Sequence, residues 1–195
     1  MPNATRSAPS WQIEHWLNAP PGLTLESLRG RVILLHAFQM LCPACVAHGL
    51  PQADRVRDIF PGVAVVALHT VFEHHEVMNI DALRAFAHEY RLRMPIGVDL
   101  RTPGSPIPRT MAAYGMRGTP SLVLIDQHGL IRLEHFGRLD DLALGAAIGR
   151  LLAEGMRQPD DSAPVLAAPS AGDGPCSAEA CGVSRGRAAA GVAPA

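Results

Sequence analysis

Residues 32–45 read VILLHAFQMLCPAC, and this stretch decides the fold. Its first four residues are apolar on both faces, which predicts a short strand buried within a sheet. Cys42-Pro43-Ala44-Cys45 follows the strand and leads into a segment with helical periodicity. A cysteine in the first turn of a helix lies near unpaired backbone N–H groups, which favour its thiolate. Cys45, three residues later, is on the same helical face and within disulfide reach, so we expect a reactive, reversible dithiol.

Composition limits the classes of function. The chain has 195 residues, of which 48% are hydrophobic, and a net formal charge of −1, which predicts one globular domain plus tails. No basic field indicates binding to nucleic acid or to an anionic membrane, and no apolar run reaches the roughly 18–20 residues of a membrane span. The N-terminus lacks the apolar segment of a secretory signal, so we expect a cytoplasmic protein. Four cysteines in two close pairs then favour redox or metal chemistry.

Hydrophobic periodicity predicts the order of elements around the central strand. Further strands are expected at residues 63–71, 94–99, 121–126 and 130–136, and helices at about 43–60, 79–90, 107–114 and 140–154. Pro51 lies inside the first helix and should kink it. This alternation predicts an α/β fold with a mixed central sheet, parallel at its heart and antiparallel at one edge, flanked by helices.

The sequence divides into three parts. Residues 1–20 are polar and Pro-rich and are expected to form an N-terminal extension, anchored by Trp11 and Trp16. Residues 21–155 form the domain. Residues 156–195 are rich in Ala, Gly and Pro with little apolar bulk, which predicts a disordered tail. This tail carries the second cysteine pair, Cys176 and Cys181.

Two motifs carry a resemblance to a known family. LTLESLRGRVILLHAF at residues 23–38, followed by CPAC, resembles the TlpA/redoxin branch of the thioredoxin-like fold. The second motif is Gly118-Thr119-Pro120, directly before the apolar run SLVLID. The resemblance covers about residues 21–154 and implies a cis proline at 120, facing the dithiol. It also implies thiol–disulfide exchange with a disulfide-containing protein or small molecule, without a bound cofactor or metal, and an external thiol reductase or oxidant as partner.

The resemblance assigns roles to five residues. Cys42 is the expected nucleophile, because thiols in such motifs have pKa values lowered from about 8.5 to roughly 3.5–7.5. Cys45 is expected to resolve the mixed disulfide. Thr119, through its carbonyl, and Pro120 are expected to position an extended substrate chain. His36 stands where thioredoxins have a buried Asp; it is either a core histidine bonded to backbone or a proton relay for Cys45.

The sequence departs from the family at two further positions. Leu41 replaces the aromatic residue that commonly precedes the first cysteine. Gln39 stands three residues before Cys42, where peroxiredoxins carry a Thr or Ser that polarises peroxide.

Other functions remain open on the sequence alone. A redoxin-type, peroxide-reducing antioxidant enzyme is one alternative. A non-catalytic metal or metalloid carrier is another, with the cysteine pairs, His69 or the run Glu73-His74-His75-Glu76 as ligands. The pair Cys176/Cys181 is a possible intramolecular relay to the first dithiol. A flexible linker of about 20 residues reaches about 25 Å, whereas the domain's radius of gyration is about 14 Å.

Overall fold

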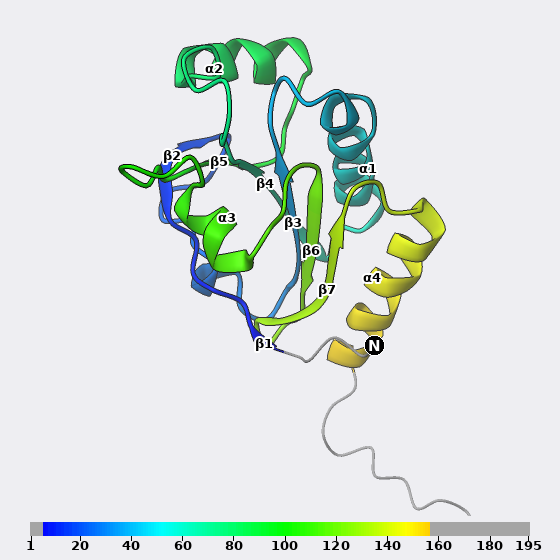
Figure 1. Cartoon of the computed structure of the whole chain (residues 1–195). Helices are drawn as coiled ribbons and strands as arrows, with labels where there is room; N and C mark the ends of the chain where they lie inside the picture. Colours follow the sequence, from blue (N-terminus) through cyan, green and yellow to red (C-terminus); the bar gives the residue numbers. More distant parts are fainter. Residues whose placement is uncertain (1–5, 157–195) are drawn as a thin grey trace, which may run out of the picture. The chain divides into compact units, whose positions relative to one another are not determined.

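Seven strands of the part that the structure describes form one sheet, in the order β1-β7-β6-β3-β4-β5-β2 (Figure 1). The structure is a computed structural model and describes residues 6–156. The strands are β1 (Arg6–Ser7), β2 (Ile13–Leu17), β3 (Val32–Phe38), β4 (Val63–His69), β5 (Ile96–Asp99), β6 (Ser121–Ile125) and β7 (Leu130–Phe136). The helices are η1 (Glu26–Leu28, 3₁₀), η2 (Cys45–Gly49, π), α1 (Leu50–Ile59), α2 (Ile80–Glu89), α3 (Arg109–Tyr114) and α4 (Asp141–Met156).

The central strand is β3, and all seven of its residues are buried. It runs parallel to β4, which runs parallel to β5, while β6 pairs antiparallel with both β3 and β7. The predicted α/β fold with a mixed sheet is therefore confirmed. Because three neighbouring strands run the same way, their carboxyl ends lie at one edge of the sheet, where the Cys42–Cys45 motif begins.

The two outermost strands come from the N-terminal stretch. Arg6 of β1 pairs with Ile131 of β7, and Leu17 of β2 pairs with Ile96 of β5. The stretch that the sequence sets apart as an extension thus supplies both edge strands of the sheet.

Both tryptophans of that stretch pack on the domain. Trp11 and Trp16 are partly buried, with their ring centroids 6.3 Å apart. Trp11 donates a hydrogen bond from Nε1 to the hydroxyl of Tyr114, at 3.1 Å. The expectation that these rings anchor the segment is confirmed.

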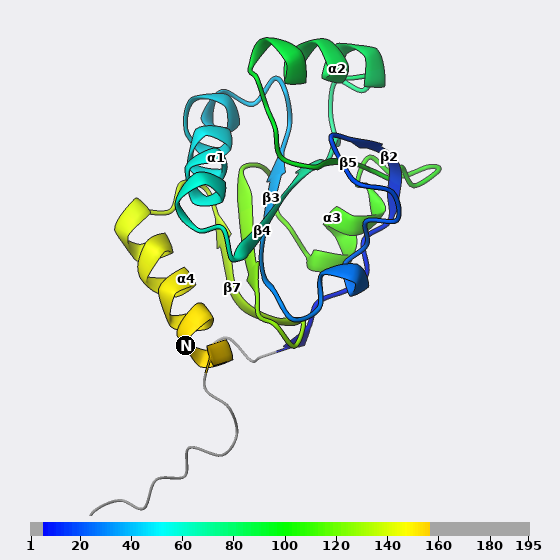
Figure 2. The same cartoon turned by 180° about the vertical axis from the view of Figure 1, so that it is seen from behind.

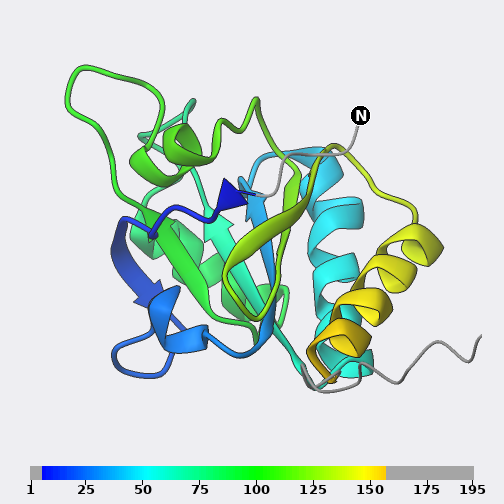
Figure 3. The ribbon, with the colours of Figure 1, turned by 90° about the horizontal axis from the view of Figure 1, so that it is seen from below.

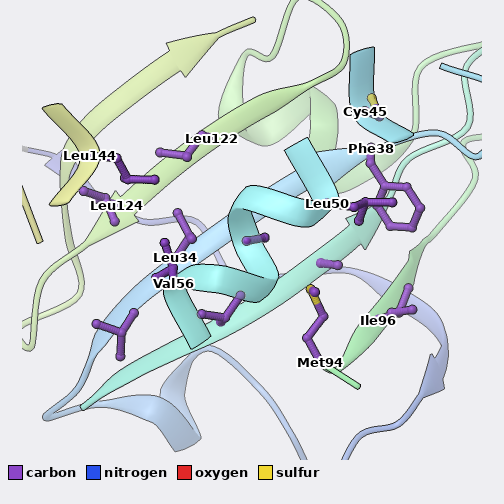
Figure 4. Packing of buried hydrophobic residues seen from close by; sticks show 14 of the residues in the cluster. Leu34, Phe38, Cys45, Leu50, Val56, Met94, Ile96, Leu122, Leu124 and Leu144 are labelled. Atoms are coloured by element: carbon purple, nitrogen blue, oxygen red, sulfur yellow. The ribbon is translucent and has the colours of Figure 1, made fainter. Parts of the chain in front are cut away.

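Alternate residues of β3 face two apolar clusters. Leu34 and Phe38 face the cluster under α1 and α4, whereas Ile33 and Leu35 face the cluster near α3 and the N-terminal segment. Figures 2 and 3 show α1 and α4 on one face of the sheet and α3 on the other. Figure 4 shows the first cluster, with Cys45 at one end of it near Phe38. The second cysteine is thus part of the core.

The helical segment that begins at the cysteine motif changes its winding before α1. Helical backbone begins at Pro43, and residues Cys45–Gly49 form a π-helical turn before α1. A proline at 51 lacks an N–H, and its ring would clash with the carbonyl four residues earlier in a regular helix. Residue 47, whose carbonyl the Pro51 ring would meet, lies in the wider π turn, and Pro51 itself lies in the first turn of α1. The kink expected at Pro51 stays a prediction.

Side-chain oxygens cap the starts of two helices. Asn79 accepts hydrogen bonds from the backbone N–H groups of Asp81 and Ala82 at the start of α2. Asp140 accepts from Leu142 N, at 2.9 Å, at the start of α4. Among residues 6–156, no helix is both long and apolar enough to cross a bilayer. The predicted tail, residues 156–195, lies outside the described residues apart from its first residue, which ends α4.

Candidate active site

The two cysteines of the motif lie in different environments. Cys42 is partly exposed at the start of the helical segment, whereas Cys45 is fully buried at 0% exposure. Both are free thiols in this structure. The backbone N–H of Cys45 donates to Cys42 Sγ, at 3.3 Å. An N–H aimed at a sulfur in the first helical turn stabilises a thiolate there, so Cys42 is placed to act as the nucleophile.

Cys45 is held as a thiol. Burial raises its pKa to about 12, and its hydrogen bond with Cys42 acts in the same direction. Solvent reaches the thiol of Cys42, whereas the thiol of Cys45 is buried. This asymmetry fits one attacking and one resolving cysteine.

Thr119 and Pro120 face the dithiol from the loop before β6. Their peptide bond is cis, as the family resemblance implies. The thiol of Cys42 donates to the carbonyl oxygen of Thr119, at 3.6 Å. Two further bonds fix this loop: Gly137 N donates to Pro120 O at 2.8 Å, and Ser121 Oγ donates to Gly118 O at 2.7 Å. Cys42 and Thr119, 77 positions apart in the chain, thus meet at one site.

His36 lies beneath the helix that carries the cysteines. Its side chain is 2% exposed, and a Cβ on Gly49 would come within 2.5 Å of its Cε1 and Nε2. The same Cβ would lie 3.4 Å from Cβ of Pro120, so ring, helix and proline converge. Burial lowers the pKa of His36 to about 4, which keeps the imidazole neutral at pH 7. Its Nε2 has no hydrogen-bond partner among the described residues.

Gln39 is a site residue whose structural role the sequence does not reveal. It is 1% exposed, and its backbone oxygen accepts from Cys42 N at 3.2 Å. Its side chain donates from Nε2 to Glu73 Oε1 at 3.2 Å and accepts at Oε1 from Phe72 N at 3.3 Å. Gln39 therefore joins the cysteine loop to the loop after β4. Its position three residues before the nucleophile was the only signal in the sequence.

The histidines considered as metal ligands do not gather. Within residues 6–156, no group of three or more His, Cys, Asp or Glu side chains is arranged to hold a metal ion. His69 is buried in β4, with its ring centroid 5.2 Å from that of Phe38, and burial lowers its pKa to about 4. His74 is exposed and His75 partly buried on the following loop. The second pair, Cys176 and Cys181, lies outside the described residues.

Three solved structures resemble this chain over most of its described part. No protein-family model and no curated protein matches it. The crystal structure of a protein of the thioredoxin-like superfamily is 57% identical, with a TM-score of 0.73, and the match covers 75% of this chain and 96% of that one. The chain belongs to the thioredoxin-like superfamily.

Two further solved structures are similar to this chain. A thiol-disulfide isomerase from Corynebacterium glutamicum is 44% identical, with a TM-score of 0.71, over 75% of this chain and 97% of that one. A thioredoxin-like protein solved in its oxidised form is 25% identical, with a TM-score of 0.65, over 77% and 97%. The resemblance drawn from the CPAC and Gly-Thr-Pro motifs is confirmed.

Proposed function

We propose that this member of the superfamily is a thiol–disulfide oxidoreductase that works through Cys42 and Cys45. One observation carries the proposal: an accessible Cys42 sulfur accepts a backbone N–H at 3.3 Å and faces the Thr119 carbonyl at 3.6 Å, with a second thiol buried behind it. The similarity to a thiol-disulfide isomerase of Corynebacterium glutamicum supports it.

The reaction proceeds in two exchanges. The Cys42 thiolate attacks one sulfur of a substrate disulfide, forms a mixed disulfide, and expels the other sulfur as a thiolate. Cys45 then loses its proton and attacks Cys42 Sγ, which releases the second substrate thiol and leaves a Cys42–Cys45 disulfide. Two electrons and two protons pass from the protein to the substrate. An external thiol reductase restores the dithiol, or an external oxidant drives the reverse flow.

His36 supplies the base for the second exchange in this proposal. The raised pKa of Cys45 makes removal of its proton costly, so a nearby acceptor would speed resolution. The imidazole is neutral, its Nε2 has no described partner, and it lies against the helix that holds Cys45. Thr119 and Pro120 position the substrate chain, since the Thr119 carbonyl, which accepts from the Cys42 thiol at 3.6 Å, has a second lone pair that can accept an N–H from an extended peptide.

The alternatives gain no support from the described residues. The Gln39 amide is hydrogen-bonded to Glu73 and to the backbone of Phe72. A peroxide-reducing enzyme would need a free group near Cys42 to polarise the peroxide. An antioxidant role, a cytoplasmic location and a relay through Cys176 and Cys181 stay predictions. A Cys176→Ser/Cys181→Ser double variant that reduces substrates at the wild-type rate rules the relay out, and cell fractionation tests the location.

The proposal is tested by trapping the first intermediate. The Cys45→Ser variant, mixed with a small disulfide, should accumulate a mixed disulfide on Cys42 that mass spectrometry locates. Cys42→Ser should form none at the motif. An adduct on Cys45 in the Cys42→Ser variant, formed at the wild-type rate, would contradict the assigned roles.

A further inference from the structure

A cavity of about 530 Å³ opens beside the loop that follows β5. Its lining includes Val71, His75, Arg101, Thr102 and Ser105, together with three prolines of residues 103–108. A second cavity, of about 180 Å³, shares Val71, His75 and Arg101 with the first. The two cavities are therefore neighbours, and together they are called the depression; the larger one has a size typical of small-molecule sites.

The charges of the larger cavity favour an anion. Arg101 and His75 are its titratable lining residues, and none of its lining residues is acidic. Within residues 6–156, Arg101 forms no ion pair, and the buried Nδ1 of His75 has no hydrogen-bond partner. Burial and the charge of Arg101 both lower the pKa of His75, and the two side chains line the same cavity. This pair suits a carboxylate, which Arg binds through two parallel hydrogen bonds.

Acidic groups line only the smaller cavity. They are Glu14, whose Oε1 lies 3.9 Å from His15 Nε2, and Asp99. The Asp99 carboxylate accepts from Thr70 Oγ1, at 3.0 Å, and from the backbone N–H groups of Thr110 and Met111, at 2.8 and 2.9 Å. Its oxygens are thus occupied, and Arg101 keeps its charge available to a ligand.

The depression lies at the same edge of the sheet as the dithiol. Phe38, His69 and Val98 pair in one row across β3, β4 and β5. Neighbouring strands are about 4.8 Å apart, so the strand leading to Cys42 and the strand leading to Arg101 are separated by about 10 Å. The bond from Gln39 to Glu73 joins the intervening loop to the cysteine loop. A peptide spans about 3.3 Å per residue, so about three residues cover this separation.

We propose that this depression binds the carboxylate of a small, peptide-like disulfide while one sulfur of that disulfide meets Cys42. The inference rests on the proposed function and names its substrate class. Arg101 pairs with the carboxylate, and His75 and Thr102 offer hydrogen bonds beside it. In the reaction, the protein dithiol becomes the Cys42–Cys45 disulfide, and the substrate disulfide becomes two thiols.

The test compares two disulfides in single turnover. The reduced full-length protein is mixed with excess glutathione disulfide, which is peptide-like and carries carboxylates, or with bis(2-hydroxyethyl) disulfide, which carries no charge. Samples are quenched with acid and alkylated, and mass spectrometry then measures the fraction of oxidised protein. The quantity that matters is the ratio of the two second-order rate constants. Arg101→Gln should lower this ratio about tenfold, because one charge-assisted hydrogen-bonded pair is lost. Arg101→Lys should restore part of it.

Matched variants control for general damage. Arg109 is exposed and lines neither cavity, so Arg109→Gln should leave the ratio unchanged. His75→Ala should lower the ratio, whereas His74→Ala, next to it in sequence and outside both cavities, should not. If both disulfides oxidise the dithiol but Arg101→Gln leaves the ratio unchanged, the inference is wrong and the function stands. If neither disulfide oxidises it, both are overturned.

Discussion

The imidazole of His36 occupies the space that a side chain at Gly49 would need. A Cβ at residue 49 would lie 2.5 Å from both Cε1 and Nε2 of the ring. The ring is buried in the central strand, and the glycine lies in the π turn that carries Cys45. The contact therefore couples the identity of residue 49 to the presence of a histidine at residue 36.

Gly49→Ala should destabilise the fold. The added methyl group meets a buried ring rather than a flexible side chain, and overpacking of this kind costs about 1–3 kcal/mol. Urea unfolding measures the loss. Gly149→Ala is the matched control, because Gly149 is an exposed helical glycine with nothing within 4 Å of its Cβ position. The control should be stabilised by about 0.5–1 kcal/mol through helix propensity. Equal effects at the two positions would contradict the packing described.

Stability should fall as the pH is lowered from 7 to 5. Burial lowers the pKa of His36 and of His69 to about 4 in the folded chain, against about 6.5 when unfolded. The unfolded state therefore binds protons first, so stability is complete above about pH 6.5 and is lost as the pH falls toward 4. Each histidine contributes about 2 kcal/mol of loss between pH 7 and 5. Urea unfolding at a series of pH values measures it.

Variants separate the two contributions. His36→Leu and His69→Leu should each remove about half of the pH-dependent loss that the two histidines produce, whatever they do to stability at pH 7. His88→Leu, at a side chain that is 85% exposed, should leave the loss unchanged. A loss that survives the removal of both buried histidines would show that other groups cause it.

His36→Phe should slow the release of the mixed disulfide. If His36 accepts the proton of Cys45, its loss should reduce the resolution rate near pH 7 by tenfold or more. The attack by Cys42 should change little, so the mixed disulfide should accumulate in rapid-quench experiments. His69→Leu removes the other buried histidine of the two adjacent strands and serves as the control. An unchanged resolution rate and pH profile in His36→Phe would end the relay hypothesis.

Gln39→Glu should destabilise the cysteine loop. The new carboxylate would face the Glu73 carboxylate, since Gln39 Nε2 now donates to Glu73 Oε1 at 3.2 Å. A carboxylate buried at residue 39 beside that of the exposed Glu73, with the loss of a hydrogen bond, costs about 2 kcal/mol. Adding Glu73→Gln should recover most of the loss, because the donor and acceptor then exchange places. Failure of the double variant to recover stability would mean that the side-chain bond does not hold the two loops together.

The sequence predicted what local patterns and the family motifs encode. The buried strand Val32–Phe38 and the dithiol after it follow from an apolar run and a short motif, and the cis bond before Pro120 follows from the family resemblance.

Features that depend on distant contacts were not readable. The edge strands Arg6–Ser7 and Ile13–Leu17 are short and polar, and only their partners β7 and β5 make them strands. Gln39 gained its role from a loop 33 residues later. Pro51 predicts that the helix is disturbed, but it does not predict a π turn at Cys45–Gly49.

The most direct test of the central claim is the oxidation state of Cys42 and Cys45 across glutathione redox buffers, read by alkylation and intact mass. Both thiols should be lost together in one two-electron transition, because a Cys42–Cys45 disulfide forms. A midpoint near −270 to −200 mV, approximately the thioredoxin and glutaredoxin range, would indicate a reductase, and one near about −120 mV an oxidant. Thiols that stay reduced throughout, or that form only separate glutathione adducts, would contradict the claim that this pair is a redox-active dithiol.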